Sequence, residues 1–528
     1  PGDPDTRRYS VLIRLGDPSP IEPARHYRKW LIDQNQFVPM AEKIQRTPKV
    51  ERLLGAAHVY LWGDDLLTRY DVRDWKRFCG KLKSHPIWQK MSEPAQKAAT
   101  EIVTGEWAAD HLKNEVAAEL SRLLATPELA DREAFAAAFP NDILPPARWG
   151  DGVSLTMLDQ LKEAGLDRLC ITTGDLSSAA RRPDVVRHAD ELGYVLGPYD
   201  SYHSIHAPGA SDTWETAQFD QALYDSGAIL KRDGTPRHGF QKKGFMLSPL
   251  AAEPYVRKRV SALMGQAPFT SWFLDCDAFG EVFDDYSPLH PSTQAEDAAA
   301  RAKRLAWISQ TYNVPVGSEG GSVYATGAMH FAHGVMTPVI GWGDPALKEK
   351  TSPYFLGAYW PPDGPQVFTK QVPLKPEYRK LYYDPRYRLP LHQTVFHDSV
   401  IATHHWSAAS LKFADQVQTT ALLELLYSVP PMYHLNRAEF KKHRERITAQ
   451  YAFFSTLHRE LALLPMTHFQ WLTDDRQVQR TVFGDKVEMV ANFGEKPFDH
   501  AGTQVPPRSI MSRRLAGGGE PQVFSPAP

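Results

Sequence analysis

Cysteine is scarce in this sequence, and long apolar runs are missing from it. The 528 residues include three cysteines, Cys79, Cys170 and Cys276, which lie too far apart for a disulfide framework or a metal knuckle. No apolar run approaches the roughly 18 residues that a membrane-spanning helix needs, and no signal peptide is visible. The cysteines leave the cellular compartment open, and we expect no membrane span.

An excess of charge of one sign is also missing. Lys and Arg number 60 against 62 Asp and Glu, which argues against a nucleic acid as partner. No Gly-x-Gly-x-x-Gly follows the first expected strand, and the chain has neither His-Glu-x-x-His nor Gly-x-Ser-x-Gly. The usual signatures of dinucleotide binding, zinc proteolysis and serine hydrolysis are therefore absent, and we expect no cofactor.

Aromatic residues, by contrast, are abundant: they make up 11% of the chain, with 13 Trp and 21 Tyr. Many stand beside Gly, Asp and His in the loop-like segments LWGDD, GPYDSYH, GWGD, GAYWPPDG and THHW. Aromatic faces stack on pyranose rings while Asp and His bind hydroxyls, so this pattern favours a carbohydrate site over a generic enzyme pocket. The histidine pairs 203/206, 330/333 and 404/405 could belong to a metal site instead; we interpret them as sugar-hydroxyl donors or core residues and expect no metal.

Short apolar strands alternate with amphipathic helices from residue 56 to residue 436, which indicates a parallel sheet. About eight such strands favour an α/β fold of the (β/α)8 TIM barrel type over an open doubly wound sheet. The stretch 72–139 is typical of a helical insertion, and the tail after 465, with a hairpin signal at Gly484-Asp485, is typical of an antiparallel β domain. We expect a strand and helix lead-in at 1–50, the barrel at 51–460 and a C-terminal β-sandwich-like domain at 461–528. The predicted strands are 8–15, 56–62, 167–175, 194–203, 269–277, 314–321, 334–344, 393–406 and 429–436.

Acidic residues end two consecutive predicted strands, and in a barrel the carboxyl ends of the strands form the active site. Strand alternation places Phe273, Asp275 and Asp277 on one face, and Glu319 ends the next strand in VGSEGG. Neighbouring strands lie about 4.8 Å apart, and carboxyls roughly 5–5.5 Å apart are the arrangement of a retaining glycosidase. The alternatives are that the two aspartates cap a helix or bind cations, and that Glu319 forms a salt bridge.

A third acid, Asp398, stands beside His397 in VFHDSV. It either binds sugar hydroxyls near the reaction centre or forms a His–Asp pair that holds a loop. Other candidates for substrate contacts follow the remaining strands or lie in aromatic loops: Trp62, Asp64, Asp65, Asp175, Asp200, Tyr202, His203, Trp342, Trp360, His404 and Trp406. Taken singly, each of the residues from Trp62 to His203 in this list also fits an ordinary loop hydrogen-bonder. The candidate stacking platforms for a sugar are Trp62, Tyr202, Trp342, Trp360 and Trp406.

The stretch SWFLDCDAFG followed by HPSTQAEDAAARAKRLAWISQTYNVPVGSEGG resembles the catalytic core of glycoside hydrolases related to families 101 and 129. That group includes endo-α-N-acetylgalactosaminidase and α-N-acetylgalactosaminidase. The resemblance implies that Asp275 is the nucleophile, with Asp277 as the alternative, and that Glu319 is the acid/base. VFHDS is also similar to the strand-seven motif of the α-amylase family, which implies a transition-state role for Asp398, and YDSYH to that family's strand-three pair, at Asp200 and His203.

The function we expect is retaining hydrolysis of an α-glycosidic bond in an oligosaccharide or glycoconjugate, in a secreted or periplasmic location. Glu319 would protonate the leaving oxygen, Asp275 would attack the anomeric carbon, and Glu319 would then activate water. A transglycosylase with the same residues and a carbohydrate-binding protein without catalysis remain the alternatives.

Overall fold

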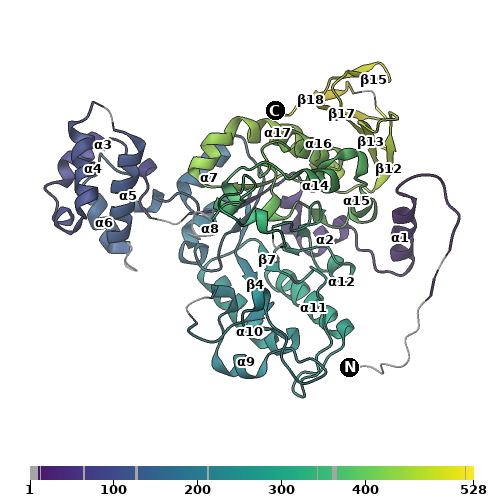
Figure 1. Cartoon of the computed structure of the whole chain (residues 1–528), viewed down its shortest axis with the longest axis horizontal. Helices are drawn as coiled ribbons and strands as arrows, with labels where there is room; N and C mark the ends of the chain where they lie inside the picture. Colours follow the sequence, from purple (N-terminus) through teal and green to yellow (C-terminus); the bar gives the residue numbers. More distant parts are fainter. Residues whose placement is uncertain are drawn as a thin grey trace. The chain divides into compact units, whose positions relative to one another are not determined.

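The computed structural model describes residues 10–11, 13–63, 66–106, 108–124, 129–210, 213–341, 343–358, 366–517 and 519–527. The chain forms two compact units (Figure 1). The first comprises Pro1–Tyr60, Leu166–His434 and Arg444–Pro528, and the second comprises Leu61–Gly165 and Leu435–His443. In the described parts of the chain, no helix is both long and apolar enough to cross a lipid bilayer.

Two sheets form the centre of the first unit, in the orders β11-β1-β2-β3 and β10-β9-β8-β7-β4. β3 and β4 are two parts of one extended run that is interrupted at Pro198, and each is the edge strand of one sheet. Counted with this run as one position, the two sheets contain eight strand positions. Every pairing from β2 to β3 and from β4 through β7, β8 and β9 to β10 is parallel. The strands are β1 (Ala57–Leu61), β2 (Leu169–Thr173), β3 (Val195–Gly197), β4 (Tyr199–Ser201), β7 (Trp272–Asp275), β8 (Val316–Glu319), β9 (Phe331–His333), β10 (Ile401–Ala402) and β11 (Met432–Leu435).

The fold is therefore a mixed α/β fold with parallel sheets, as predicted, and within the described residues no ladder joins β10 to β11. Side chains of β2, β3, β7, β9 and β10 share one apolar cluster. Gly317 in β8 has no room for a side chain, because an added Cβ would lie 2.0 Å from the Phe331 ring. This close approach explains a glycine in the middle of a buried strand.

Helices lie beside the sheets, and Figure 1 shows α10 and α11 next to each other near β4 and β7. The predicted capping box of the helix after the acidic stretch is confirmed, with Thr293 and Glu296 bonding reciprocally at the start of α11. The helices of this unit are α1 (Glu22–Asp33), α2 (Met40–Arg46), α8 (Pro183–Glu191), α9 (Gln221–Ser226), α10 (Pro249–Gln266), α11 (Gln294–Tyr312), α12 (Val323–Thr326), α13 (Gln366–Thr369), α14 (Pro376–Tyr378), α15 (Leu391–Phe396), α16 (Val417–Leu426) and α17 (Arg437–Leu461), whose first turns belong to the second unit.

Three predicted strands are wrong in whole or in large part. The range 393–406 begins with α15 and contains only the two-residue β10, and 334–341 is turns and bends that follow β9. The first residues of the former range, Gln393 to Phe396, are all buried, and a short buried apolar run does not distinguish helix from strand by its periodicity. Residues 10, 11 and 13–15 form no strand, and Val11, Ile13 and Leu15 are exposed.

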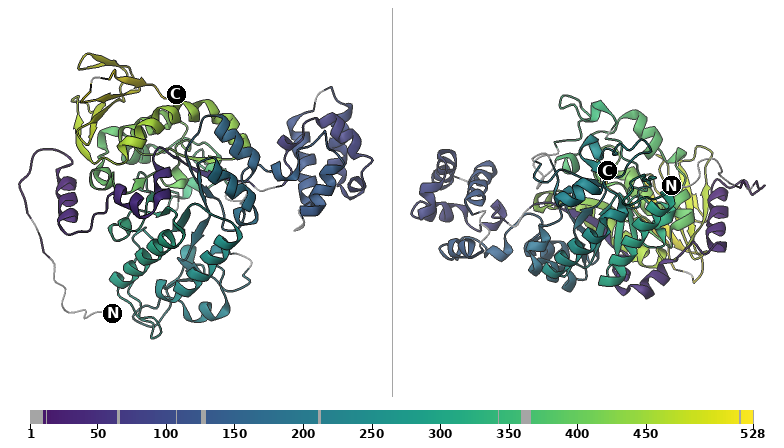
Figure 2. Two further views of the ribbon diagram at one scale, coloured as in Figure 1. Left: turned by 180° about the vertical axis from the view of Figure 1, so that it is seen from behind. Right: turned by 90° about the horizontal axis from the view of Figure 1, so that it is seen from below.

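The C-terminal sheet is antiparallel, as predicted, with the order β12-β13-β14-β17-β18. Gly484 and Asp485 both have positive φ in the turn between β13 and β14, which confirms the hairpin signal. Phe483, Met489 and Ile510 pack with Leu422 of α16 in one cluster, and Figure 2 shows this yellow sheet beside α16 and α17. The strands of this sheet are β12 (Met466–Trp471), β13 (Val478–Phe483), β14 (Val487–Asn492), β17 (Ser509–Arg514) and β18 (Gln522–Phe524). β15 (Phe498–His500) and β16 (Thr503–Val505) form a separate antiparallel pair.

The second unit is helical, and its range Leu61–Gly165 contains the whole of the predicted insertion 72–139. Its core is a cluster that contains Trp75, Phe78, Phe139 and Trp149. Arg437 forms a buried ion pair with Asp71 inside this unit. The helices are α3 (Trp75–Leu82), α4 (Glu93–Thr104), α5 (Asp110–Leu124), α6 (Leu129–Ala137) and α7 (Leu155–Glu163).

Candidate active site

Asp275 and Glu319 are the last residues of β7 and β8, which are adjacent and parallel. One carboxylate oxygen of each and Sγ of Cys276 all lie within 4.8 Å of one another. Because parallel strands end at the same edge of a sheet, two residues far apart in sequence present their carboxyls to one place. We refer to them below as the carboxyl pair.

Cys276 lies between the two carboxyls. Its φ of 62° is left-handed, which ends β7 after Asp275. Its Sγ is 3.4 Å from Oδ2 of Asp275 and 3.3 Å from Oε2 of Glu319. Burial and the two acids hold the pKa of the thiol well above its usual range, so the group is an S–H donor.

The spacing of the two carboxyls and the thiol could also accept a metal ion. The donor set is a thiol and two carboxyls, whereas calcium and magnesium take oxygen ligands in larger number. Zinc would require the thiolate, which the surrounding acids disfavour. The chemistry of the donors therefore fits a proton-sharing pair better than a metal centre.

The electrostatics of the carboxyl pair favour retention of a proton near neutral pH. Burial, followed by the neighbouring Glu319 carboxylate, raises the pKa of Asp275 to about 7, against the opposing effects of Tyr199 and His203. Burial also raises the pKa of Glu319, against the lowering effect of the hydrogen bonds with Cys276 and Asp275, and the charge of Glu281 adds a smaller increase. Two buried carboxyls this close do not both ionise readily, and the pair titrates as a unit.

His405 contacts the carboxyl pair and was missed as an individual site residue by the sequence analysis. Its Nε2 lies 3.1 Å from Oε1 of Glu319, and its Nδ1 lies 2.6 Å from Oγ of Ser407. Burial lowers the pKa of the imidazole to about 3, so the ring is neutral. The signal was the segment THHW, whose second histidine lies just past the carboxyl end of β10.

Aromatic rings surround the pair. Trp406 is half-buried, and its ring centroid lies 3.9 Å from that of His405 and 5.8 Å from that of Phe273. Tyr199 stacks on Phe273 at 5.7 Å. The predicted platform Trp406 therefore lies against His405, which contacts Glu319, and Tyr199, which sequence reasoning did not single out, hydrogen-bonds to Asp275.

A buried histidine cluster lies beside these rings. His333, at the end of β9, lies 2.9 Å from Nδ1 of His58 through its Nε2 and 3.1 Å from the Tyr60 hydroxyl through its Nδ1. Its ring stacks on Phe273 at 4.8 Å. Burial holds the pKa values of His58 and His333 low, so this cluster is neutral and contributes shape and hydrogen bonds but no charge.

His203 was predicted as a substrate contact, and it lies at the edge of this site. Its Nε2 lies 3.3 Å from Oε2 of Glu281, a half-exposed residue of the loop after β7. His203 lowers the pKa of Asp275, while Glu281 raises that of Glu319. His203 therefore acts electrostatically on Asp275, and Glu281 acts on Glu319.

Asp277, the alternative nucleophile, is not brought to the pair. It is fully buried, and Arg304 of α11 binds its carboxylate through two hydrogen bonds, one of them 2.8 Å from Nε to Oδ2. Arg301 lies 3.8 Å from the same group. Strand alternation stops at Asp275 because Cys276 is left-handed. The prediction that Asp277 shares a face with Asp275 is therefore wrong.

Asp398 and His397 are not brought to the pair either. Asp398 precedes β10, at the amino end of a strand whose carboxyl end faces the site. Arg28 binds its carboxylate at 2.7 and 2.8 Å, and His397 Nδ1 lies 2.8 Å from the Leu464 carbonyl oxygen. The prediction of one strand over 393–406 placed Asp398 inside that strand, whereas Asp398 precedes β10.

The remaining candidates have structural partners in most cases. Asp200 is buried and accepts from Arg259 at 3.1 Å, and Asp175 accepts from the backbone of Ser177 and Ser178 in an exposed turn. His404 Nε2 lies 3.4 Å from the buried Glu424. Tyr202 and Trp62 are buried, Trp62 in the second unit. Asp64, Asp65, Trp342 and Trp360 lie outside the described residues.

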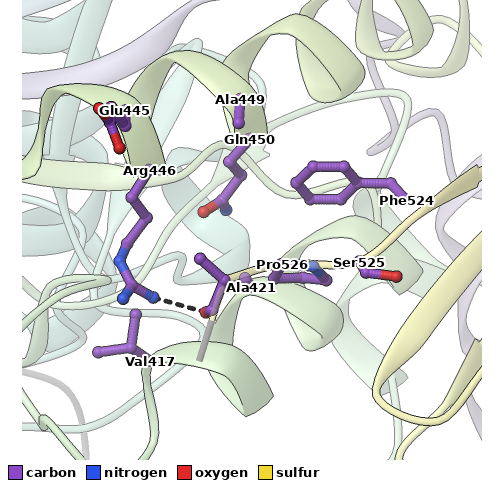
Figure 3. A pocket seen from close by; sticks show the side chains of 10 residues that line it. Val417, Ala421, Glu445, Arg446, Ala449, Gln450, Phe524, Ser525 and Pro526 are labelled. Carbon is purple, nitrogen blue, oxygen red and sulfur yellow. Dashed lines mark hydrogen bonds between the residues drawn. The ribbon is translucent and has the colours of Figure 1, made fainter.

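A pocket of about 240 Å³ lies between α16, α17 and the C-terminal segment (Figure 3). Arg446 donates to the Ala527 carbonyl oxygen at 2.7 Å, and Gln450, which also lines the pocket, donates to the buried Glu424 at 2.7 Å. None of the predicted site residues lines it.

A pair of carboxyls at the ends of adjacent parallel strands, surrounded by aromatic rings, defines the class of site that glycoside hydrolases use. The chain belongs to the glycosyl hydrolases related to the GH101 family, GH129, whose family profile matches residues 160–482. No curated protein sequence matches the chain.

Solved structures show the same fold. The α-N-acetylgalactosaminidase NagBb from Bifidobacterium bifidum, as a GalNAc complex, is 19% identical with a TM-score of 0.52 over 92% of this chain and 63% of that one. Its ligand-free form is 18% identical with a TM-score of 0.52 over the same shares of the two chains. Its Gal-NHAc-DNJ complex is 17% identical with a TM-score of 0.52 over 94% of this chain and 63% of that one. The chain thus spans less than two thirds of the length of this relative.

Proposed function

We propose that this protein hydrolyses an α-glycosidic bond with retention, with Asp275 as nucleophile and Glu319 as acid/base. The observation that carries the proposal is the carboxyl pair, whose nearest described oxygens lie within 4.8 Å at the ends of adjacent strands. Retaining glycosidases place their carboxyls about 5–5.5 Å apart, whereas inverting ones leave about 6.5–9.5 Å for a water molecule.

The reaction has two displacements. Glu319 gives its proton to the glycosidic oxygen while Asp275 attacks the anomeric carbon, so the leaving group departs as an alcohol and an ester bond to Asp275 forms. Water then attacks the same carbon, Glu319 takes one proton back, and the Asp275 carboxylate is released. The single proton that the free pair retains must be on Glu319 when substrate is bound. In the free pair the contact between the two carboxyls raises the pKa of Asp275 and lowers that of Glu319, so the proposal requires the proton to pass from Asp275 to Glu319 as substrate binds.

We propose an α-linked N-acetylgalactosaminide of an oligosaccharide or glycoconjugate as the first substrate to test, because the related NagBb structure is an α-N-acetylgalactosaminidase. Trp406 and Tyr199 are the proposed sugar-stacking rings, and His203 with Glu281 the proposed polar contacts at the edge.

We also propose that the two parallel sheets form one closed (β/α)8 barrel. The support is the succession of eight strand positions and the apolar cluster shared by strands of both sheets. The domain limits 1–50, 51–460 and 461–528 are part of the same proposal.

The test is a panel of aryl α- and β-glycosides, with the anomer of the first product followed by NMR. The expected result is cleavage of α-glycosides with the α-anomer released first. Release of the β-anomer first would mean inversion, and sugar binding without any cleavage would leave a carbohydrate-binding protein. A predominance of transfer over hydrolysis products would identify a transglycosylase.

A further inference from the structure

The two oxygens of Glu319 have different neighbours. Oε1 lies 3.1 Å from Nε2 of His405, and Oε2 lies 3.3 Å from the thiol of Cys276, which in turn contacts Asp275. A carboxylic acid carries its proton on one oxygen only. Which oxygen carries it decides the direction in which an acid catalyst donates.

The hydrogen-bond partners of His405 determine its tautomer. The backbone N–H of Ser407 donates to Nδ1 at 3.0 Å, so Nδ1 is an acceptor and carries no proton. Burial keeps the ring neutral, and its one proton is therefore on Nε2, which faces Oε1 of Glu319. An oxygen that accepts this N–H is not the oxygen that carries the acid proton. The thiol of Cys276 has a single proton and contacts both carboxyls, so the proton of Glu319 can lie on Oε2 when the thiol donates to Oδ2 of Asp275 and its sulfur accepts from Oε2.

We propose that His405 is a positioning residue that reserves Oε1 of Glu319 as an acceptor and places the catalytic proton on Oε2, the oxygen beside Cys276. The proposal rests on the proposed acid/base role of Glu319. The other groups that act on Glu319 are Asp275 and Cys276 from β7 and its turn, Glu281 from the following loop and Tyr60 from β1, and all of them are acidic or neutral. His405 is thus a fixed donor that can stabilise the Glu319 carboxylate when the proton has left, without adding a charge.

The comparison of His405→Phe with His405→Gln tests this, because glutamine retains an N–H donor and phenylalanine does not. In His405→Phe we expect kcat/KM for an aryl glycoside with a poor leaving group to fall about 10²-fold, in the range of general acid catalysis. The 2,4-dinitrophenyl glycoside, whose leaving group needs no protonation, should change several-fold at most. The basic limb of the pH profile should move to higher pH, since losing a donor to the carboxylate raises the pKa of Glu319, and His405→Gln should restore its position.

Glu319→Gln, assayed in parallel, separates the two levels of the argument. If it keeps full activity, the acid/base assignment is wrong. The other outcome is that Glu319→Gln loses activity in a leaving-group-dependent way, while His405→Phe loses kcat/KM equally for both glycosides and keeps its pH profile. In that case His405 is merely structural, and only the present proposal is wrong.

A measurement on the unmodified protein covers the case in which His405→Phe does not fold. With ¹⁵N-labelled histidine, we expect the His405 ring, assigned by its absence from the His405→Gln spectrum, to be the Nε2–H tautomer. An Nδ1–H tautomer would overturn the proposal.

Discussion

Nε2 of His405 lies 3.1 Å from Oε1 of Glu319, although 86 residues separate them in the chain. The contact exists because β8, β9 and β10 are parallel neighbours, so the residues that follow β10 face the residue that ends β8. A neutral donor, a thiol and a second carboxyl therefore surround one glutamate at the edge of the sheet. Each of the following predictions addresses one part of this arrangement.

Removal of either carboxyl should separate their two roles. Asp275→Ala should lower turnover by several orders of magnitude, and azide should then give a glycosyl azide of inverted configuration, because only one displacement remains. Glu319→Ala should lower turnover by about 10²–10⁴-fold with poor leaving groups, and azide should give the retained product. Product NMR and unchanged thermal melting are the measurements; full activity of either variant contradicts the assignment.

Asp277→Ala should act on stability and not directly on chemistry. Its removal leaves Arg304 buried without its partner, and breaking a buried ion pair in this way costs about 3–5 kcal/mol. Urea unfolding should show this loss, and the protein that remains folded at low temperature should keep most of its turnover. A stable but inactive Asp277→Ala, together with an active Asp275→Ala, would move the nucleophile to Asp277.

Gly320→Ala should disturb the turn that follows Asp275. An added Cβ would lie 2.6 Å from the Ala278 carbonyl oxygen and 2.6 Å from Cα of Phe279, so the backbone must move. Gly209→Ala is the matched control, because its φ of 74° is nearly equal to the 75° of Gly320 and an added Cβ has no neighbour within 4 Å. The control should lose about 1–2 kcal/mol for the left-handed conformation alone.

Gly320→Ala should lose more stability than this control and should also lose kcat/KM. Equal losses of stability in the two variants, with full activity in both, would mean that the turn after β7 tolerates the displacement.

Glu281→Gln should shift the pH dependence of activity. The charge of Glu281 raises the pKa of Glu319, so its removal lowers that pKa and the acid form is lost at lower pH. The basic limb of kcat/KM should therefore move to lower pH, opposite to the shift expected for His405→Phe. Because Glu281 is half-exposed, the shift should shrink at high salt; a shift to higher pH contradicts the argument.

Glu424 should make the protein less stable as pH rises. Burial raises its pKa to about 8, so the folded state keeps a proton that the unfolded state releases near pH ~4.3. The stabilisation is complete below that value and is lost as pH rises toward about 8. Glu424→Gln resembles the protonated acid, because its carbonyl oxygen can accept from Gln450 and its NH2 can donate to the Ser410 hydroxyl. This variant should flatten the decline in Tm across this range.

Some of this site could be predicted from residues that are close in sequence. Asp275 and Glu319 follow apolar runs of strand character, and the glycines after Glu319 mark a tight turn, so their places at strand ends followed from pattern. The predicted strand 393–406, which contained Asp398, was wrong, because the periodicity of a short buried run does not distinguish a helix from a strand. That one misassigned element placed Asp398 near the reaction centre, and His405 was considered only as one half of the pair 404/405.

The sequence by itself determined the parallel α/β character, the antiparallel C-terminal sheet, the capping box of α11 and the two acids at the ends of β7 and β8, because each depends on periodicity or on side chains a few residues apart. Only the tertiary structure decided that Cys276 turns left-handed and separates Asp275 from Asp277, that Arg304 binds Asp277, and that His405 bonds to Glu319. The two side-chain contacts join residues that are 27 and 86 positions apart in the chain. They depend on the register of parallel strands and on burial, which no local pattern encodes.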